Sequence, residues 1–228
     1  MSIGIGKKIV GKGCFVRDEA IVEYCKGKRV LHVGCTDYPF FESSLANGHL
    51  LHAKVSQVAS RVIGIDIASE DVAVMIDNGY DARVIDAQTM SAHDWDELFD
   101  VVLLADVIEH ISNPGLVISE ARKLLAPHGK VVITVPNAFG IVRYIKSFFQ
   151  YEQVHHDHIA YYSSGVLETL ATHTGLRVEE SSWYQFEARD KRLIVRLSAA
   201  FEKLITRFFP WQSEGCISVM TRLEINET

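Results

Sequence analysis

Short apolar runs alternate with amphipathic segments along most of the chain. Runs rich in Val, Ile and Leu without polar alternation are typical of strands that are buried on both faces. The amphipathic segments between them carry apolar residues at helical spacing, and several end at Gly. Strands that alternate with helices indicate a parallel sheet joined by crossover helices, so we predict an α/β fold with helices on both faces. The predicted strands are 29–33, 62–66, 82–85, 99–104, 131–135, 176–181 and 216–225.

Helix signals fall between these strands. An apolar stripe predicts a helix over about 48–59. Asn113 followed by Pro114 is typical of a helix start, and we expect Pro127 and Gly129 to end that helix. The other predicted helices are 18–26, 69–78, 164–174 and an amphipathic segment at about 190–209.

The composition narrows the class of protein. The 228 residues, 48% of them hydrophobic and 23% charged, fit one globular domain with a full core. A net charge of −6 gives no general field that would attract nucleic acid, so no nucleic-acid partner is expected. The four cysteines form no C-x-x-C pair, and residues 1–13 lack the apolar core of a secretory signal. We therefore expect reduced thiols and a cytoplasmic protein.

A glycine or an aspartate stands at the end of each of the first four predicted strands. Gly34 follows the first strand, and Asp66, Asp86 and Asp106 follow the next three. Ligands of open parallel sheets bind at the carboxyl ends of the strands, where a carboxylate can accept hydrogen bonds from ribose hydroxyls. One such acid alone is most simply the N-cap of the next helix. Four such residues in this order favour a nucleoside site.

Four segments resemble the class I S-adenosylmethionine-dependent methyltransferases. The first glycine-containing motif of that family resembles residues 30–35, VLHVGC. Its ribose-binding strand end resembles residues 63–67, IGIDI, and its fourth-strand signature is very similar to residues 99–111, FDVVLLADVIEHI. The segment from 124 to 137 matches what comes next in the family. The resemblance covers about residues 28–182, and its fourth-strand signature is the most specific part.

The resemblance implies a fold and a cofactor. The fold is a Rossmann-like sheet of seven strands, mostly parallel with an antiparallel last strand, and the cofactor is S-adenosylmethionine. Gly34 would lie under the methionine part of the cofactor and Asp66 would hold its ribose. The other implied contacts are Ile67 packing on the adenine, Asp86 and Ala87 at the adenine amine, and Ala105 and Asp106 beside the methyl donor.

The glycine loop departs from the family pattern. His32 occupies the place of the usual acid, and Thr36 and Asp37 stand where further glycines are expected. Asp37 is our candidate for the carboxylate that holds the cofactor's ammonium group. Because no G-x-G-x-x-G follows the first strand, a dinucleotide oxidoreductase is only a distant alternative.

A histidine-rich segment follows the fifth strand. Methyl transfer to a hydroxyl requires a base that takes its proton, and a histidine suits that role. His156 and His158 are therefore our candidates for the catalytic base. The alternatives are a structural role at the start of the helix that Ser163 caps, and a metal site. No metal site is predicted, because His155, His156 and His158 lack an obvious fourth ligand.

The C-terminal amphipathic helix has two interpretations. Leu193, Leu197, Phe201, Leu204 and Phe208 share one face beside a basic stripe. The helix either packs on the core, covers the substrate pocket or forms a homodimer contact, or it makes a peripheral contact with a membrane surface.

The prediction as a whole is one methyltransferase domain over 1–228. Its helical lead-in is expected over 1–27 and a helical insertion over 190–210. We expect O-methylation of a small or sugar-like acceptor, by analogy with bacterial polysaccharide biosynthesis. The alternative is a non-catalytic S-adenosylmethionine-binding or scaffolding protein. The acceptor pocket is expected to contain Phe139, Tyr144, Phe148, Phe149, Tyr161 and Tyr162.

Overall fold

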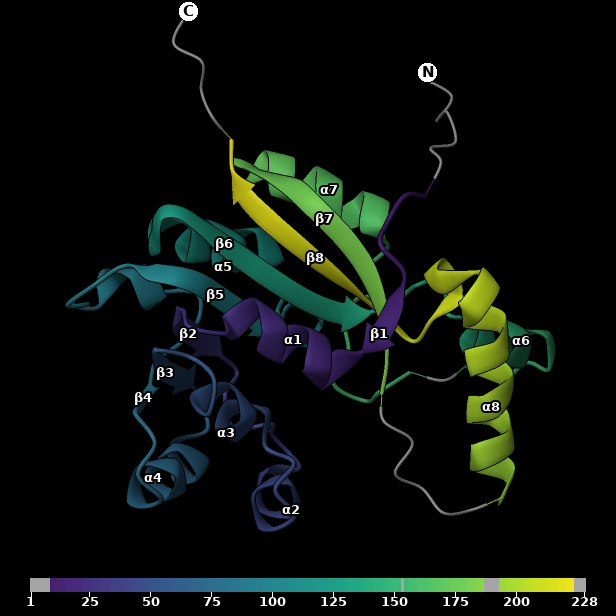
Figure 1. The fold of residues 1–228 in the computed structure, drawn as a ribbon, viewed down its shortest axis with the longest axis horizontal. Coiled ribbons are helices and arrows are strands. Elements are labelled where there is room, and N and C mark those ends of the chain that lie inside the picture. The colour runs from purple at the N-terminus through teal and green to yellow at the C-terminus, as the bar shows by residue number, and fades with distance from the viewer. Residues whose placement is uncertain (1–8, 153, 187–192, 224–228) are drawn as a thin grey trace, which may run out of the picture.

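The computed structural model describes residues 9–152, 154–186 and 193–223. These residues form one eight-stranded sheet with the order β1-β7-β8-β6-β5-β2-β3-β4 (Figure 1). Neighbouring strands run parallel, except that β8 is antiparallel to both β6 and β7. The strands are β1 Cys14–Val16, β2 Arg29–Val33, β3 Arg61–Asp66, β4 Ala82–Val84, β5 Phe99–Ala105, β6 Leu125–Pro136, β7 Leu176–Gln185 and β8 Gly215–Arg222.

Helices cover both faces of the sheet (Figure 1). One buried cluster joins the sheet to α5 and α7, and another joins its opposite face to α1 and α3. The helices are α1 Arg17–Cys25, α2 Phe41–Ala46, α3 Leu51–Ser56, α4 Ser69–Asp77, α5 Pro114–Lys123, α6 Ile141–Phe148, α7 Ser164–His173 and α8 Leu193–Phe208.

The apolar runs of the central strands explain this layering. In β6, Val131, Ile133 and Val135 belong to the cluster under α5 and α7, whereas Val132 belongs to the cluster under α1 and α3. Successive side chains of a strand point to opposite faces, so a run without polar residues can only be buried by helices on both sides. The predicted α/β class is therefore confirmed.

The strand prediction is close to the structure, and the differences have local causes. The additional strand β1 pairs with the edge of β7, from Cys14 beside Trp183 to Val16 beside Gln185. It was not predicted because three residues carry no periodicity that could indicate a strand. It makes the described sheet eight-stranded rather than seven-stranded.

One predicted helix is shorter than expected, and two observed helices have no predicted counterpart. The helix expected over 48–59 is only Leu51–Ser56, and α2 and α6 were not predicted. Asn113 does cap α5, since its side chain accepts a hydrogen bond from the backbone of Leu116. The prediction that Pro127 and Gly129 end this helix is wrong. They lie within β6, where the pairing with β5 shifts register between Phe99 and Val101.

The structure describes most of the predicted helical lead-in and of the predicted helical insertion. The lead-in over 1–27 contains β1 and α1, and residues 1–8 lie outside the described residues. The insertion over 190–210 contains α8, while residues 190–192 lie outside the described residues. The predicted last strand corresponds to β8, and residues 224–225 again lie outside.

The contact between β7 and β8 provides a stability test. A Cβ added to Gly215 would lie 2.0 Å from Cζ of the fully buried Tyr184. We expect Gly215→Ala to lower the free energy of unfolding by about 1–3 kcal/mol, because the ring has no space to move into. Gly165→Ala in α7, whose Cβ would be 4.0 Å from the nearest atom, should have no such effect. Urea denaturation measures both, and equal stabilities would contradict the expectation.

Candidate functional site

Asp106, directly after β5, connects the strands that form the site. Its backbone is left-handed, with φ of +54°, a conformation that costs energy outside glycine. Its N–H donates to the carbonyl oxygen of Thr134, 3.0 Å away, and to the Thr134 hydroxyl. Its Oδ1 accepts hydrogen bonds from the Thr134 hydroxyl (3.0 Å) and the Tyr184 hydroxyl (2.8 Å). The carboxylate therefore ties β5 to β6 and β7.

Arg17 completes this network, and sequence reasoning missed it. Its Nη2 lies 2.7 Å from Oδ2 of Asp106, and its guanidinium lies over the rings of Tyr184 and Phe186. The Asp106 carboxylate raises the pKa of Arg17 despite the opposing effect of burial. The strand β1, which precedes Arg17 directly, positions it beside the end of β7. A cavity of about 490 Å³ opens next to Arg17 and is lined by residues of α1 and α3 and by Phe186.

The residues predicted to bind a nucleoside lie at the ends of β2, β3 and β4. Gly34 has φ of +72°, and a Cβ there would meet Val107 at 2.8 Å, so the backbone at the end of β2 stays bare. Ile67 is 73% exposed, although it is a large apolar residue at a strand end. An exposed apolar side chain beside the Asp66 carboxylate suits a ligand with a flat ring next to a sugar.

The two acids of this region also hold neighbouring backbone. Oδ2 of Asp66 accepts hydrogen bonds from the N–H and the hydroxyl of Thr36, and Oδ1 accepts one from the N–H of Ala68. Asp86 is exposed, and its Oδ1 accepts a hydrogen bond from the N–H of Gln88. A carboxylate offers about four acceptor positions, so among the described residues both acids keep capacity for a ligand hydroxyl or amine.

Asp37 lies close to the charged network. Its backbone is left-handed, and its Oδ2 accepts a hydrogen bond from the Ser44 hydroxyl in α2. Burial raises the pKa of Asp37, the nearby Asp18 and Asp106 carboxylates raise it further, and the Ser44 bond and Arg17 lower it. The structure thus brings the proposed ammonium-binding carboxylate to the same end of the sheet as Asp106.

The histidine at the usual acid position does not face the site. His32 and His52 are buried, their rings stack in parallel, and their Nδ1 atoms lie 3.2 Å apart. Burial lowers the pKa of His52 to about 4 and lowers the pKa of His32 well below its usual range. Both rings are therefore neutral at pH 7, and the pair ties α3 to β2.

The histidine segment folds back over the turn after β5. The His110 ring donates from Nδ1 to the carbonyl oxygen of Asp157, and the N–H of Ile159 donates to the carbonyl oxygen of Glu109. His158 is half-buried, and its Nδ1 has no hydrogen-bond partner among the described residues. By contrast, the His156 side chain is 74% exposed, and its Nε2 lies 3.0 Å from Asp157.

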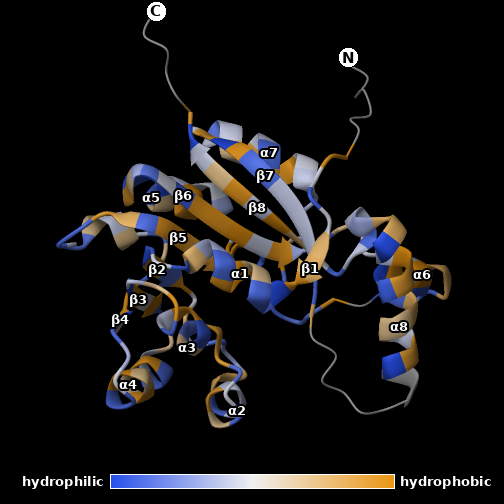
Figure 2. Ribbon diagram, viewed as in Figure 1, coloured by the Kyte–Doolittle hydropathy of each residue, from blue (hydrophilic) through white to orange (hydrophobic). Residues whose placement is uncertain are grey.

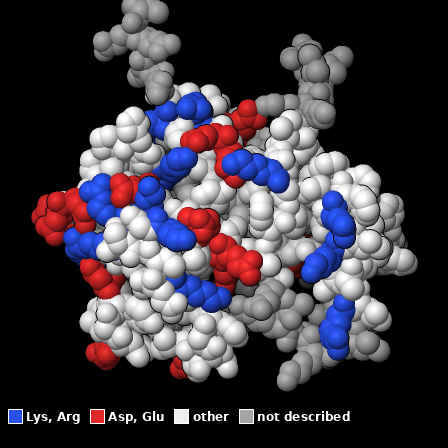
Figure 3. Space-filling model, viewed as in Figure 1, with Lys and Arg blue, Asp and Glu red and all other residues white. Residues whose placement is uncertain are grey.

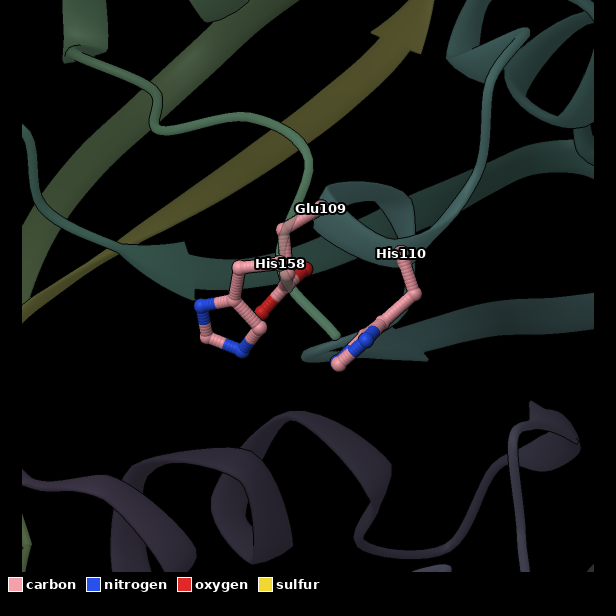
Figure 4. Close-up of side chains that lie close together, drawn as sticks. All are labelled: Glu109, His110 and His158. Carbon is pink, nitrogen blue, oxygen red and sulfur yellow. The ribbon is translucent and has the colours of Figure 1, made fainter. Parts of the chain in front are cut away.

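Glu109, His110 and His158 meet at this turn (Figure 4). Glu109 is fully buried, and neither of its carboxyl oxygens has a partner among the described residues. Burial, and then the charge of Asp106, raise the pKa of Glu109 to about 9, so the group is protonated at pH 7. Burial, and then His110 and His155, lower the pKa of His158 to about 4. Among the described residues, the buried Glu109 carboxyl therefore stabilises no neighbouring element through a side-chain hydrogen bond.

The same side chains supply donor atoms of the kind that bind metal ions. One ligand atom each from Glu109, His110 and His158 lies within 4.8 Å of the others, and His155, His156 and Asp157 form a second such group. Mixed imidazole and carboxylate sets suit transition metals.

The predicted aromatic pocket is only partly present. Tyr161 lines a cavity of about 430 Å³ together with Arg143 and Tyr151. Tyr162 is buried, and its hydroxyl donates to the carbonyl oxygen of Ile108. The other residues expected in this pocket, in α6 and its flanks, are exposed and do not line this cavity: Phe139, Tyr144, Phe148 and Phe149.

Comparison with known proteins identifies the family. Residues 20–181 match the family described as a methyltransferase domain. The chain belongs to the class I S-adenosylmethionine-dependent methyltransferases. The fold is similar to an S-adenosylmethionine-dependent methyltransferase from Archaeoglobus fulgidus, with a TM-score of 0.58, 18% identity and coverage of 90% of this chain and 91% of that chain. The predicted family, fold class and cofactor are confirmed.

Curated relatives of this methyltransferase share its sequence more clearly. The ubiquinone biosynthesis O-methyltransferase of Azorhizobium caulinodans is 28% identical over 138 residues, which are 59% of this chain and 48% of that protein. The enzyme of the same name from Hydrogenovibrio crunogenus is 25% identical over 179 residues, 73% of this chain and 69% of that protein. The chain thus spans about half the length of the first relative.

The residues of this methyltransferase fit its cofactor. The bare backbone at Gly34, the exposed Ile67 and the carboxylates of Asp66 and Asp86 lie at adjacent strand ends. When it is bound, S-adenosylmethionine supplies an electrophilic methyl group on a sulfonium. Asp66 would accept hydrogen bonds from the ribose and Asp37 would face the ammonium group.

A binding measurement tests this placement. Asp66→Asn should weaken S-adenosylmethionine binding about 10- to 100-fold, because a charged acceptor at the ribose is lost. Asp37→Ala should weaken it to a similar extent if this carboxylate holds the ammonium group. Asp77→Asn, an exposed acid at the end of α4, is the matched control. Isothermal titration calorimetry gives the affinities, and unchanged binding in Asp66→Asn would contradict the assignment.

Proposed function

We propose that this protein transfers the methyl group of S-adenosylmethionine to a hydroxyl of a small molecule, with His158 as the base. The observation that supports the proposal most directly is the state of the His158 ring. It is neutral at pH 7, and its Nδ1 has no partner among the described residues, beside the turn that follows Asp106. A neutral imidazole in that place can accept a proton.

The charged and neutral groups around His158 favour transfer of the acceptor's proton to this ring. Bound S-adenosylmethionine would supply the methyl group, and His158 would take the proton that the acceptor hydroxyl loses. The Asp106 carboxylate favours the charged form of His158, since it raises the pKa of this ring against the effect of burial. Protonated Glu109 adds no second negative charge beside it at pH 7.

His110 acts as the support of this base. Its ring holds the backbone at Asp157 and packs edge-on against His158, with 4.6 Å between the ring centres. A base held by a fixed loop contributes both orientation and proton transfer. His156, exposed and paired with Asp157, stays a predicted second candidate that the geometry favours less.

The names of the relatives favour a small-molecule hydroxyl as the acceptor. Two relatives are named ubiquinone biosynthesis O-methyltransferase, which supports O-methylation and gives no support to a polysaccharide pathway. The sugar-like acceptor and the cytoplasmic location stay predictions from the sequence. The alternative of a non-catalytic cofactor-binding protein is not favoured, because Glu109 and Nδ1 of His158 lie near Asp106 without hydrogen-bond partners among the described residues.

The test is S-adenosylhomocysteine formation with a panel of phenols, catechols and sugars. With an accepted substrate, His158→Gln should lower kcat about 10²- to 10⁴-fold and leave cofactor affinity unchanged, because only the proton acceptor is lost. The wild-type kcat should hold from about pH 6.5 to about pH 5, since a base with a pKa of about 4 stays neutral there.

Controls separate this role from others. His93→Ala, an exposed histidine outside the site, should keep the wild-type rate. A His158→Gln enzyme with full kcat would exclude His158 as the base. Activity that chelation abolishes and a divalent cation restores would assign the Glu109, His110 and His158 cluster to a metal instead. Cofactor binding without product from any hydroxyl compound would favour the non-catalytic alternative.

A further inference from the structure

The orientation of α8 is the reverse of what a helix on the surface of a globular domain adopts. Glu202 and Thr206 are buried against the domain, where the Thr206 hydroxyl accepts a hydrogen bond from Nε2 of Gln185. Four large apolar side chains of the same helix, at positions 197, 201, 204 and 208, point outward. A surface helix normally buries its apolar stripe and exposes its polar residues.

The outward apolar residues form one continuous stripe. They are spaced by four, three and four residues, which places them on the same face of a helix. Their exposed fractions range from 46% to 66%. Contiguous apolar surface of this kind marks an interaction site in soluble proteins. The stripe consists of Leu197, Phe201, Leu204 and Phe208.

The neighbouring helix α6 adds aromatic side chains to this region. It lies beside α8 at the edge of the domain (Figure 1), and both helices carry strongly apolar positions (Figure 2). Tyr144, Phe148 and Phe149 are 60%, 70% and 80% exposed. Arg143 fixes α6 through hydrogen bonds to the carbonyl oxygens of Asn137 and Glu214. These hydrogen bonds tie α6 to the end of the sheet next to α8.

The charge of this region is opposite to that of the chain. The whole chain has a net charge of −6, yet the exposed charged residues of α8 are basic, namely Arg196, Lys203 and Arg207. The Lys and Arg side chains along α8 stand apart from acidic groups on the face shown in Figure 3. The one acidic residue among the residues of α6 and α8 is the buried Glu202.

We propose that the exposed face of α8, together with α6, docks on the surface of an anionic lipid bilayer. The helix would lie in the plane of the interface, with Phe201, Leu204 and Phe208 among the acyl chains and the basic residues at the phosphates. A second copy of this chain is a poorer occupant. A two-fold contact through this face would bring basic residues against basic residues. In the described part of the chain, no helix is long and apolar enough to cross a bilayer.

Vesicle co-sedimentation of the full-length protein tests the proposal. We expect binding to equimolar phosphatidylglycerol and phosphatidylcholine vesicles that exceeds binding to pure phosphatidylcholine by about tenfold or more and falls with added salt. The double variant Leu204→Ser/Phe208→Ser should lose this binding, because the inserting side chains are removed. Lys203→Glu/Arg207→Glu should reduce binding to the anionic vesicles about tenfold or more and leave the weak binding to neutral vesicles unchanged.

The control is Ile76→Ser, which removes a similarly exposed apolar side chain from α4, away from α8. It should bind vesicles as the wild type does. The proposal is overturned if the wild-type protein does not bind anionic vesicles, or if both double variants bind as the wild type does. It is also overturned if light scattering shows a dimer that Leu204→Ser/Phe208→Ser dissociates while vesicle binding is absent.

Discussion

The ion pair between Arg17 and Asp106 is the interaction on which the site depends. It joins the first residue of α1 to the end of the central strand β5, 2.7 Å apart and largely shielded from water. The same carboxylate accepts hydrogen bonds from Tyr184 and Thr134, so one side chain connects α1, β5, β6 and β7. Removing one partner of such a pair leaves a buried charge uncompensated, and the cost of that charge holds the arrangement together.

Burial sets the charge states of the titratable groups around Asp106. Glu109 stays protonated and His158 stays neutral at pH 7, mainly because both are shielded from water. The buried pair of His32 and His52 is neutral for the same reason. The turn after β5 thus combines one compensated carboxylate with neutral groups that can exchange protons. This combination suits a reaction in which a hydroxyl loses its proton while a sulfonium loses its charge.

Local patterns in the sequence were sufficient to predict most of the sheet. The strands 29–33 and 99–104 were predicted almost residue by residue, because a parallel strand buried on both faces has a distinctive apolar run. The family motif indicated Gly34, Asp66 and Asp106. The short strand β1 carried too little periodicity to be predicted. The amphipathic pattern of α6 was present in the sequence, but it was not interpreted as a helix.

The parts of the site that could not be predicted depend on contacts between segments that are far apart in the sequence. Arg17 meets Asp106 only because β1 pairs with β7, and β1 itself could not be predicted. His52 stacks on His32 across 20 residues, and nothing local connects them. Glu109 was visible in the fourth-strand motif, but only the folded chain shows that its carboxyl has no hydrogen-bond partner in the described part of the structure. The sequence predicted that α8 is amphipathic. Only the structure shows that its polar residues Glu202 and Thr206 are the ones buried against the domain.

A double-mutant cycle between Arg17 and Asp106 tests the central claim most directly. The free energy of unfolding would be measured by urea denaturation for Arg17→Gln, Asp106→Asn, the double variant and the wild type. The account predicts a coupling energy of about 2 kcal/mol or more, because each single variant leaves a buried group without its partner. Effects that add to within about 0.5 kcal/mol would contradict the claim that this pair organises the site.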